Sequence, residues 1–318
     1  MKSLCEQCPR GCGAGRERGV GYCGANGEIR LARASLHLWE EPCISGERGS
    51  GALFFVGCNL RCVYCQNRNI SRCVTHGVAV SEEELERIML RLQAEGAQSL
   101  NLVTPTPYTE QIARVLSRVK PKLSIPVVYN CGGYESVETL RRLEGLVDVY
   151  LPDCKYFSPE LSALYSDAPD YFSVATDAIA EMLRQTGRPQ FDGHGMLRRG
   201  VLVRHLVLPG CRQDSEQLLR ALAKRFGKDA FLLSLMNQYT PDFAPADAPK
   251  NLRRRVTSFE YGRVAEVVET LGFAGYFQDR QASSASYTPD FEGEGERSVL
   301  EKKDAEDLVK NAEIDPRP

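Results

Sequence analysis

The chain has 318 residues, of which 42% are hydrophobic and 26% are charged, and its formal net charge is -2. This composition predicts a globular protein with one large core and a small appendage. The near-neutral charge argues against a nucleic-acid-binding surface, and no apolar run reaches the roughly 18 residues of a membrane span. The first residues lack the apolar stretch of a secretory signal. We therefore expect a cytoplasmic protein without nucleic-acid or membrane partners.

Most of the twelve cysteines fall into two clusters with short spacing. Disulfide bonds in a secreted protein would be one explanation, but without a secretory signal this clustering favours metal binding. The first cluster consists of Cys5, Cys8, Cys12 and Cys23. Four thiolates can close a metal site, and the nearby Arg10 and Arg16 would offset their charge. The spacing leaves open an auxiliary 4Fe-4S cluster, a structural zinc ion, or unligated thiols on a disordered arm.

The second cluster, Cys58, Cys62 and Cys65, directly follows the apolar run 52–56. Three thiolates cannot close a four-ligand site, so the trio predicts a 4Fe-4S cluster with one iron open to an exogenous ligand. Two alternatives remain. The thiols could be ordinary buried cysteines, or they could bind zinc together with His76.

The CxxxCxxC spacing, with Tyr64 before the third cysteine, resembles the signature of the radical S-adenosylmethionine (SAM) superfamily. The continuation Gln66-Asn67 and several later segments are most similar to the branch of pyruvate formate-lyase activating enzymes and their uncharacterised relatives. The resemblance covers roughly residues 52–279. It implies that SAM chelates the open iron and that the reduced cluster cleaves SAM to a 5'-deoxyadenosyl radical. It also implies an anaerobic setting, with Tyr64 and Asn67 close to the cofactor.

Six short apolar runs predict strands, at 52–56, 100–103, 125–129, 147–151, 201–208 and 230–236. Helices are predicted between them, at 81–95, 108–119, 213–226 and 258–271. The segment 170–186 begins like a strand but continues a helical stripe, and we assign it to a helix. The alternation of strands and helices predicts an α/β fold with a parallel sheet. The family resemblance implies a partial (β/α)6 TIM-like barrel, which a further strand at 272–277 would extend toward a full barrel.

Three regions are expected along the chain: a Cys-rich metal-binding module at 1–45, the barrel at 46–279, and a polar, poorly ordered tail at 280–318. The remaining cysteines are expected to be core thiols. These are Cys43, Cys73, Cys131, Cys154 and Cys211.

Polar residues follow the predicted strands, where a barrel places its active site. Thr104 and Thr106 stand where many relatives carry a Gly-Gly-Glu-Pro segment that holds the methionyl amino group of SAM. Their hydroxyls could accept the same hydrogen bonds, or the segment could be a proline-stiffened loop. Asp153 and Lys155 resemble an Asp-x-Lys pair of the activating enzymes, with a surface ion pair as the alternative. Asn130 offers an amide to the cofactor or forms a turn.

Arg204 and His205 are adjacent in a predicted strand, so only one of them can face the barrel interior. The resemblance implies that they lie near the carboxylate and the adenosine of SAM, whereas a structural histidine is the alternative for His205. No catalytic residue is identified beyond the cluster and SAM.

The sequence therefore predicts a radical SAM oxidoreductase that abstracts hydrogen from a substrate. The resembled branch suggests a glycyl residue of a partner enzyme, with a small molecule or another peptide as the rival substrate. Flavodoxin or ferredoxin is the expected reductant. An iron-sulfur electron carrier or redox sensor that does not cleave SAM is the alternative from another class.

Overall fold

A ten-stranded sheet forms the centre of the part of the chain that the computed structural model describes, namely residues 5–17, 19–72, 76–278, 289, 291 and 294–300. The strands are β1 (Ile29–His37), β2 (Ser50–Phe55), β3 (Val78–Val80), β4 (Leu100–Val103), β5 (Val127–Cys131), β6 (Val149–Pro152), β7 (Gln190–Phe191), β8 (Leu197–Leu206), β9 (Leu232–Met236) and β10 (Gly275–Phe277). Their order is β10-β9-β8-β6-β5-β4-β2-β1-β3, with β7 pairing to β8.

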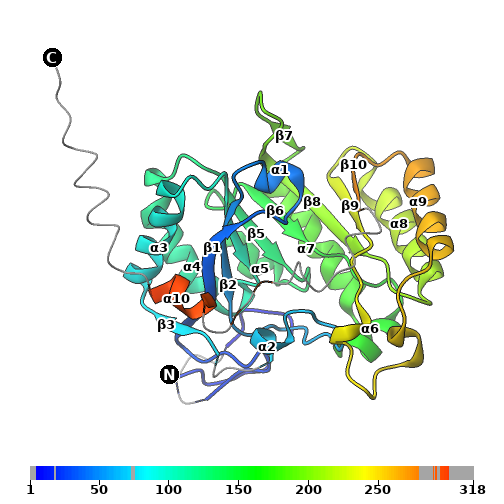
Figure 1. The fold of residues 1–318 in the computed structure, drawn as a ribbon, viewed down its shortest axis with the longest axis horizontal. Helices are drawn as coiled ribbons and strands as arrows, with labels where there is room; N and C mark the ends of the chain where they lie inside the picture. Colours follow the sequence, from blue (N-terminus) through cyan, green and yellow to red (C-terminus); the bar gives the residue numbers. More distant parts are fainter. Residues whose placement is uncertain are drawn as a thin grey trace.

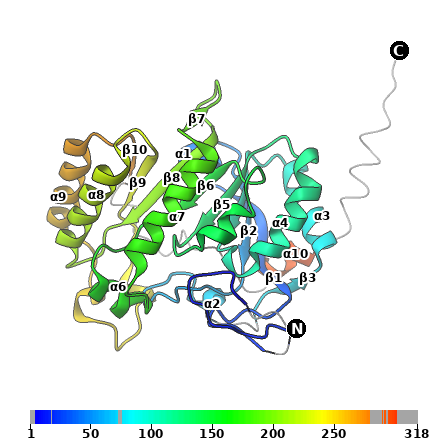
Figure 2. The ribbon, with the colours of Figure 1, turned by 180° about the vertical axis from the view of Figure 1, so that it is seen from behind.

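The helices are α1 (Pro42–Ser45), α2 (Arg68–Ser71), α3 (Glu82–Ala94), α4 (Thr109–Val119), α5 (Val137–Arg141), α6 (Pro159–Ser166), α7 (Tyr171–Thr186), α8 (Arg212–Phe226), α9 (Ser258–Leu271) and α10 (Glu294–Leu300). The larger ones cover the outer face of the curved sheet (Figures 1 and 2). None of the helices within the described residues has the length and apolarity that crossing a membrane requires.

The predicted α/β fold with a mostly parallel sheet is confirmed. All six predicted strands are present, and β2, β4, β5, β6, β8 and β9 pair in parallel in this order. β10 adds a further parallel strand beside β9. The sequence did not reveal β1 and β3, which pair antiparallel at the other edge. β1 lies within the stretch expected to form the Cys-rich module.

The helix predictions are also confirmed, including the ambiguous segment 170–186, which forms α7. Helix α3 begins with a capping box, in which the Ser81 side chain accepts from the Glu84 backbone N–H and the Glu84 carboxylate accepts from the Ser81 N–H. Of the expected polar tail, the described part includes α10, which packs on β1. The Ser298 hydroxyl there accepts a hydrogen bond of 3.0 Å from the backbone N–H of Ala34.

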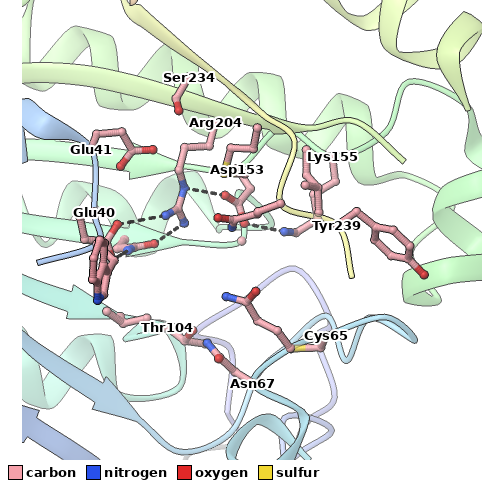
Figure 3. A pocket seen from close by; sticks show the side chains of 18 of the residues that line it. Glu40, Glu41, Cys65, Asn67, Thr104, Asp153, Lys155, Arg204, Ser234 and Tyr239 are labelled. Atoms are coloured by element: carbon pink, nitrogen blue, oxygen red, sulfur yellow. Dashed lines mark hydrogen bonds and ion pairs between the residues drawn. The ribbon is translucent and has the colours of Figure 1, made fainter. Parts of the chain in front are cut away.

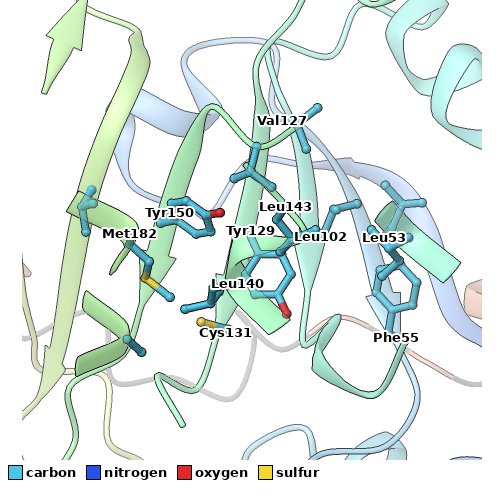
Figure 4. Packing of buried hydrophobic residues seen from close by; sticks show 14 of the residues in the cluster. Leu53, Phe55, Leu102, Val127, Tyr129, Cys131, Leu140, Leu143, Tyr150 and Met182 are labelled. Atoms are coloured by element: carbon cyan, nitrogen blue, oxygen red, sulfur yellow. The ribbon is translucent and has the colours of Figure 1, made fainter. Parts of the chain in front are cut away.

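The core lies between the sheet and its outer helices (Figure 4). Successive strand residues point to opposite faces, so Tyr129 and Tyr150 pack toward the helices near Leu140 and Met182. Cys131 and Cys154 are buried in this core, as predicted, and Cys131 also lines the cavity inside the sheet. Cys73 lies outside the described residues.

Helix α1 packs against the inner face of the curved sheet. Its residues Cys43 and Ile44 form a buried cluster with Val128, Val149 and Leu151, which alternate with the residues that face the outer helices. The curved sheet and its outer helices form a half-barrel, and the segment that follows β1 therefore crosses the inside of this half-barrel. This arrangement closes the sheet at the end opposite to α2 (Figure 1).

Candidate active site

The sheet encloses a cavity of about 620 Å³ (Figure 3). Ten of the predicted site residues line it: Cys58, Cys62, Tyr64, Cys65, Asn67, Thr104, Asn130, Asp153, Lys155 and Arg204. They come from the loop after β2 and from the ends of β4, β5, β6 and β8. Residues far apart in the sequence thus meet at one place, because the carboxyl ends of parallel strands share one edge.

The loop that carries the trio leaves β2 through Gly57, whose φ is +94°. A Cβ atom at this position would lie 2.8 Å from the carbonyl oxygen of Cys23, so the loop packs directly on the N-terminal segment. The Cys65 N–H then closes a turn on the carbonyl oxygen of Cys62 at 3.2 Å. Helix α2 follows, so the three thiols stand between a strand and a helix.

Each thiol of the trio has a hydrogen-bond donor beside it. The Ser166 hydroxyl lies 3.0 Å from the Cys62 Sγ, the Ser71 hydroxyl lies 3.6 Å from the Cys65 Sγ, and the Leu60 N–H lies 3.4 Å from the Cys58 Sγ. Hydrogen bonds to sulfur are one of the means by which a protein sets the potential of an iron-sulfur cluster. The surroundings of the trio therefore fit thiolates that bind such a cluster.

Burial raises the pKa of the Cys58 thiol to about 12, with the neighbouring Cys62 and Cys65 acting in the same direction. Burial also raises the pKa of Cys65. A metal would have to displace these protons, since thiolates are the ligating species. Within the described ranges, no three His, Cys, Asp or Glu side chains are close enough to hold a metal ion as they stand. His76, the alternative fourth ligand, does not line the cavity.

A chain of hydroxyl groups leads from the wall of the cavity to Cys62. The Tyr64 and Tyr156 hydroxyls lie 2.6 Å apart, and the Tyr156 hydroxyl lies 2.8 Å from that of Ser166, which in turn reaches the Cys62 Sγ. Burial raises the pKa of both tyrosines well above the ordinary value. These phenols therefore remain neutral and act as hydrogen-bonding groups.

A buried ionic network stands across the cavity from the trio. The Arg204 Nε donates to Asp153 Oδ1 at 2.9 Å, its Nη2 donates to Asn130 Oδ1 at 2.5 Å, and Lys155 Nζ lies 2.5 Å from Asp153 Oδ2. Burial raises the pKa of Asp153, but the charges of Arg204 and Lys155 outweigh burial and hold that pKa below the usual value. Burial lowers the pKa of Lys155, but the charge of Asp153 outweighs burial and holds that pKa above the usual value. All three groups are therefore charged at neutral pH.

Glu40 and Glu41 are cavity residues that the sequence reasoning missed. Glu40 accepts hydrogen bonds from Asn101 Nδ2 at 2.9 Å and Asn130 Nδ2 at 3.3 Å, and it pairs with Arg204 at 3.3 Å. Burial raises the pKa of both glutamates, while the charge of Arg204 opposes the increase. The one signal in the sequence is two consecutive carboxylates directly before the short apolar helix α1.

Two of the residues predicted to bind the cofactor, Thr106 and His205, do not line this cavity. Thr104, with a φ of +58°, lines it, but the chain then turns into a short 3-10 helix (Thr106–Tyr108) and the Thr106 hydroxyl donates to Glu135 Oε1 at 2.7 Å. His205 points to the face of β8 opposite to Arg204, where its Nδ1 lies 2.7 Å from the carbonyl oxygen of Cys154. The structure thus gives both residues structural contacts away from the trio.

The four N-terminal cysteines gather around a separate, small cavity of about 10 Å³. It is lined by Cys5, Cys8, Cys12, Cys23, Gln7, Arg16, Tyr22, Asn59, Thr106 and Pro107. The backbone N–H of Arg10 donates to the Cys8 sulfur, and the backbone N–H of Ala25 donates to the Cys23 sulfur. Arg16 donates from Nη1 to the Pro107 carbonyl, while its Nε and Nη2 are buried without a partner.

Comparison with known proteins gives one family. Residues 53–222, more than half of the chain, match the model of the radical SAM superfamily, and the match includes the whole trio. An uncharacterized protein of Methanocaldococcus jannaschii is 29% identical over 275 residues, which cover 83% of this chain and 74% of that protein.

Among solved structures, a radical SAM methyltransferase from Sphaerobacter thermophilus is 14% identical, with a TM-score of 0.47, over 70% of this chain and 63% of that one. The chain thus spans less than two thirds of the methyltransferase. SuiB of Streptococcus suis bound to the precursor peptide SuiA is 13% identical, with a TM-score of 0.49, over 70% of this chain and 46% of that one.

Proposed function

The chain belongs to the radical SAM superfamily, and we propose that it is an oxidoreductase that binds a 4Fe-4S cluster through Cys58, Cys62 and Cys65. The observation that carries this proposal is that the three thiols flank the same cavity as a set of buried cations and amides. When bound, the cluster supplies the electron that cleaves SAM to a 5'-deoxyadenosyl radical, which takes hydrogen from the substrate. The alternative of a simple electron carrier does not explain the polar cavity.

The cavity offers complementary groups for the polar parts of SAM. Lys155 and Arg204 provide positive charge for its carboxylate, and Thr104 provides a hydroxyl. The Asn67 Oδ1 is buried without a hydrogen-bond partner, so it can accept from an amino or ribose hydroxyl group. Aromatic side chains, Tyr64 and Tyr239 among them, form the adjoining wall and exclude water from a reactive radical.

The substrate we favour is a compact one, either a small molecule or one side chain of a peptide. The cavity of about 620 Å³ has to hold SAM as well, so the space left for a substrate suits a small group, and the charged groups of the cavity lie inside the half-barrel. A glycyl residue of a partner enzyme, as in the activating enzymes that the sequence resembles, would have to enter this space on a protruding loop. Flavodoxin or ferredoxin is the proposed electron donor.

The decisive experiment measures 5'-deoxyadenosine formed by anaerobically reconstituted protein from SAM and a strong chemical reductant. The Cys62→Ala variant is expected to form none, because it lacks one cluster ligand. Cys43→Ala is the matched control, since Cys43 is a buried thiol in the α1 cluster and does not line the cavity. Equal product from wild type and Cys62→Ala, or none from wild type with an intact cluster, would refute the proposal.

We also propose that the four N-terminal cysteines bind one zinc ion. The cavity between them, about 10 Å³, admits about one water-sized sphere, which favours a single ion over a larger cluster. Arg16 lines this cavity and has two buried nitrogens without a partner, and a four-thiolate site would supply negative charge beside its guanidinium group. Hydrogen bonds from the Arg10 and Ala25 N–H groups support the sulfurs.

The zinc proposal is tested by elemental analysis of the purified protein before any iron is added. Wild type is expected to hold about one zinc per chain, and Cys8→Ser to hold none, while Cys43→Ser keeps the metal. Iron in place of zinc, lost in Cys8→Ser, would identify the auxiliary cluster instead, and retention of zinc by Cys8→Ser would place the ion elsewhere.

A further inference from the structure

Glu41 lines the cavity, and the contacts proposed above for the cluster and SAM do not involve it. Its side chain belongs to a residue that is only 8% exposed, and its Oε2 is buried without a hydrogen-bond partner. Buried polar atoms are nearly always paired, and an unpaired carboxylate is among the most costly groups to bury. An unpaired acceptor on a residue that lines a cavity therefore indicates a donor that arrives with a ligand.

The neighbouring side chains do not supply that donor. The charge of Arg204 acts on Glu41, but the hydrogen bonds of Arg204 go to Asp153, Glu40 and Asn130. Ser234 is within hydrogen-bonding reach of the Glu41 carboxyl group, and Oε2 still has no partner. The protein thus leaves one carboxylate oxygen of Glu41 without a hydrogen-bond donor.

The charge of the cavity points the same way. Its lining contains three carboxylates, on Glu40, Glu41 and Asp153, and two permanently cationic groups, on Lys155 and Arg204. Asp153 is compensated by both cations and Glu40 by Arg204. One negative charge is left over. Burial raises the pKa of Glu41, the charge of Arg204 opposes this increase, and the charge of Glu40 adds to it. A ligand that brings one positive charge would balance the site.

The position of Glu41 separates it from the cluster site. It directly precedes α1, which is packed inside the half-barrel, and Figure 3 shows it with Ser234 on the side of the cavity opposite to Cys65 and Asn67. Tyr276 also lines the cavity, and its pKa is raised first by burial, then by Cys43 and by the charge of Glu41. A cavity lined by both a carboxylate and an aromatic ring is suited to organic cations.

We propose that Glu41 anchors the substrate, and that the substrate carries a cationic nitrogen group, an ammonium or a guanidinium, remote from the hydrogen that is abstracted. This inference rests on the proposed function, which supplies the reaction, and it adds the chemical class of the substrate. Binding at Glu41 itself requires no turnover. The cationic group can come from a free amine or from a Lys or Arg side chain of a peptide, since both present the same chemistry.

The experiment is anaerobic titration calorimetry on reconstituted protein in the presence of SAM. The probes are hexylamine and agmatine as free cations, the tripeptide Gly-Lys-Gly as a side-chain cation, and hexanol as an uncharged match for hexylamine. Wild type is expected to bind at least one cationic probe saturably and hexanol at least about tenfold more weakly. Tighter binding of the free amines or of the tripeptide identifies the source of the cation.

Two variants of Glu41 and one control complete the test. Glu41→Gln is expected to weaken cation binding by at least about tenfold, because a charge-assisted hydrogen bond is lost. Glu41→Asp, which keeps the charge but shortens the reach, is expected to bind with intermediate affinity. Glu47→Gln, six positions along the chain and exposed, is the control and should bind as wild type does.

Three results would overturn the proposal: no cationic probe binds wild type, Glu41→Gln binds the probes unchanged, or Glu41→Gln weakens SAM binding as much as cation binding. The last result would assign Glu41 to the cofactor. Failure of the proposed function shows itself separately, as absence of 5'-deoxyadenosine from wild-type protein that still binds the cations.

Discussion

The backbone N–H of Cys58 donates a hydrogen bond of 3.1 Å to the carbonyl oxygen of Cys23. One residue belongs to the trio and the other to the N-terminal set, so a single peptide hydrogen bond joins the two groups of cysteines. The tight approach of Gly57 to the same carbonyl oxygen reinforces this contact. The N-terminal segment is thereby part of the support of the trio loop.

Removal of metal from the N-terminal cysteines is expected to loosen the trio loop. Without the ion, Cys23 is held less firmly and the Cys58 N–H loses a fixed acceptor, so its hydrogen exchange should accelerate by about tenfold. Hydrogen exchange of residues 57–62, with and without a chelator, measures this effect. The amides of β9 are the internal reference, and an unchanged rate at 57–62 would show that the two groups are mechanically independent.

Asp153→Asn is expected to weaken both stability and SAM binding. Asp153 is the shared partner of Arg204 and Lys155, and removing one member of a buried charge network costs about 3 kcal/mol of unfolding free energy. The dissociation constant for SAM should rise by about tenfold, since the two cations lose their orientation. Chemical denaturation and equilibrium binding check the two effects.

Asp177→Asn serves as the control for Asp153→Asn, because Asp177 pairs with Arg225 at an exposed position on the outer helices. It should behave like wild type in both measurements. Normal SAM affinity in Asp153→Asn would show that the network supports the fold but not the cofactor.

The buried carboxyl group of Glu135 is expected to make the free energy of unfolding depend on pH. Burial raises its pKa from 4.5 to about 7, in spite of the hydrogen bonds from Thr106 and Tyr129. The folded state therefore binds more protons than the unfolded state between these two values, so stability falls as pH rises from about 4.5 to about 7. The loss amounts to about 3 kcal/mol at most.

Glu135→Gln is expected to abolish this part of the pH dependence and to be more stable than wild type at pH values above 7. Urea unfolding at a series of pH values measures the slope. Glu138→Gln, at an exposed position three residues further on, is the control and should keep the wild-type slope. A Glu135→Gln variant with an unchanged slope would show that other groups cause the dependence.

Ser166→Ala is expected to make the reduction potential of the cluster more negative. The Ser166 hydroxyl donates to the Cys62 Sγ at 3.0 Å, and a hydrogen bond to sulfur stabilises the more negative, reduced cluster. One such bond, at about 1 kcal/mol, corresponds to roughly 40 mV for one electron. Spectroscopic redox titration of the reconstituted protein measures the shift.

Ser162→Ala is the control for the potential, since Ser162 is equally buried in α6 and its hydroxyl donates to the Pro159 carbonyl oxygen instead. Its cluster should keep the wild-type potential. A shift of the same size in both variants would point to a general change in α6.

The parallel strands and the trio loop were predictable because their signals are local. An apolar run followed by closely spaced cysteines specifies a strand and a ligand loop without reference to the rest of the fold. The strand-end rule also located Asn130 and Asp153, since every parallel strand of such a sheet delivers its end to one edge. Most of the functional side chains at this edge of the sheet can therefore be predicted from short stretches of sequence.

Other parts depend on the path of the chain in three dimensions. Thr104 and Thr106 look equivalent in the sequence, but the positive φ of Thr104 and the 3-10 helix after it turn Thr106 toward Glu135. Glu40 and Glu41 reach the cavity only because β1 pairs antiparallel with β2 and the chain then re-enters the half-barrel. No local pattern encodes these long-range contacts.

The packing of α1 inside the half-barrel has a consequence for how this protein can diversify. The cysteine trio lies within the stretch shared with the superfamily, residues 53–222, whereas Glu40 and Glu41 lie before it. Substitutions in the segment that leads into α1 can therefore alter the floor of the cavity while the cluster ligands stay untouched. The cluster ligands and the carboxylates of the cavity therefore belong to separate stretches of the chain that can change independently.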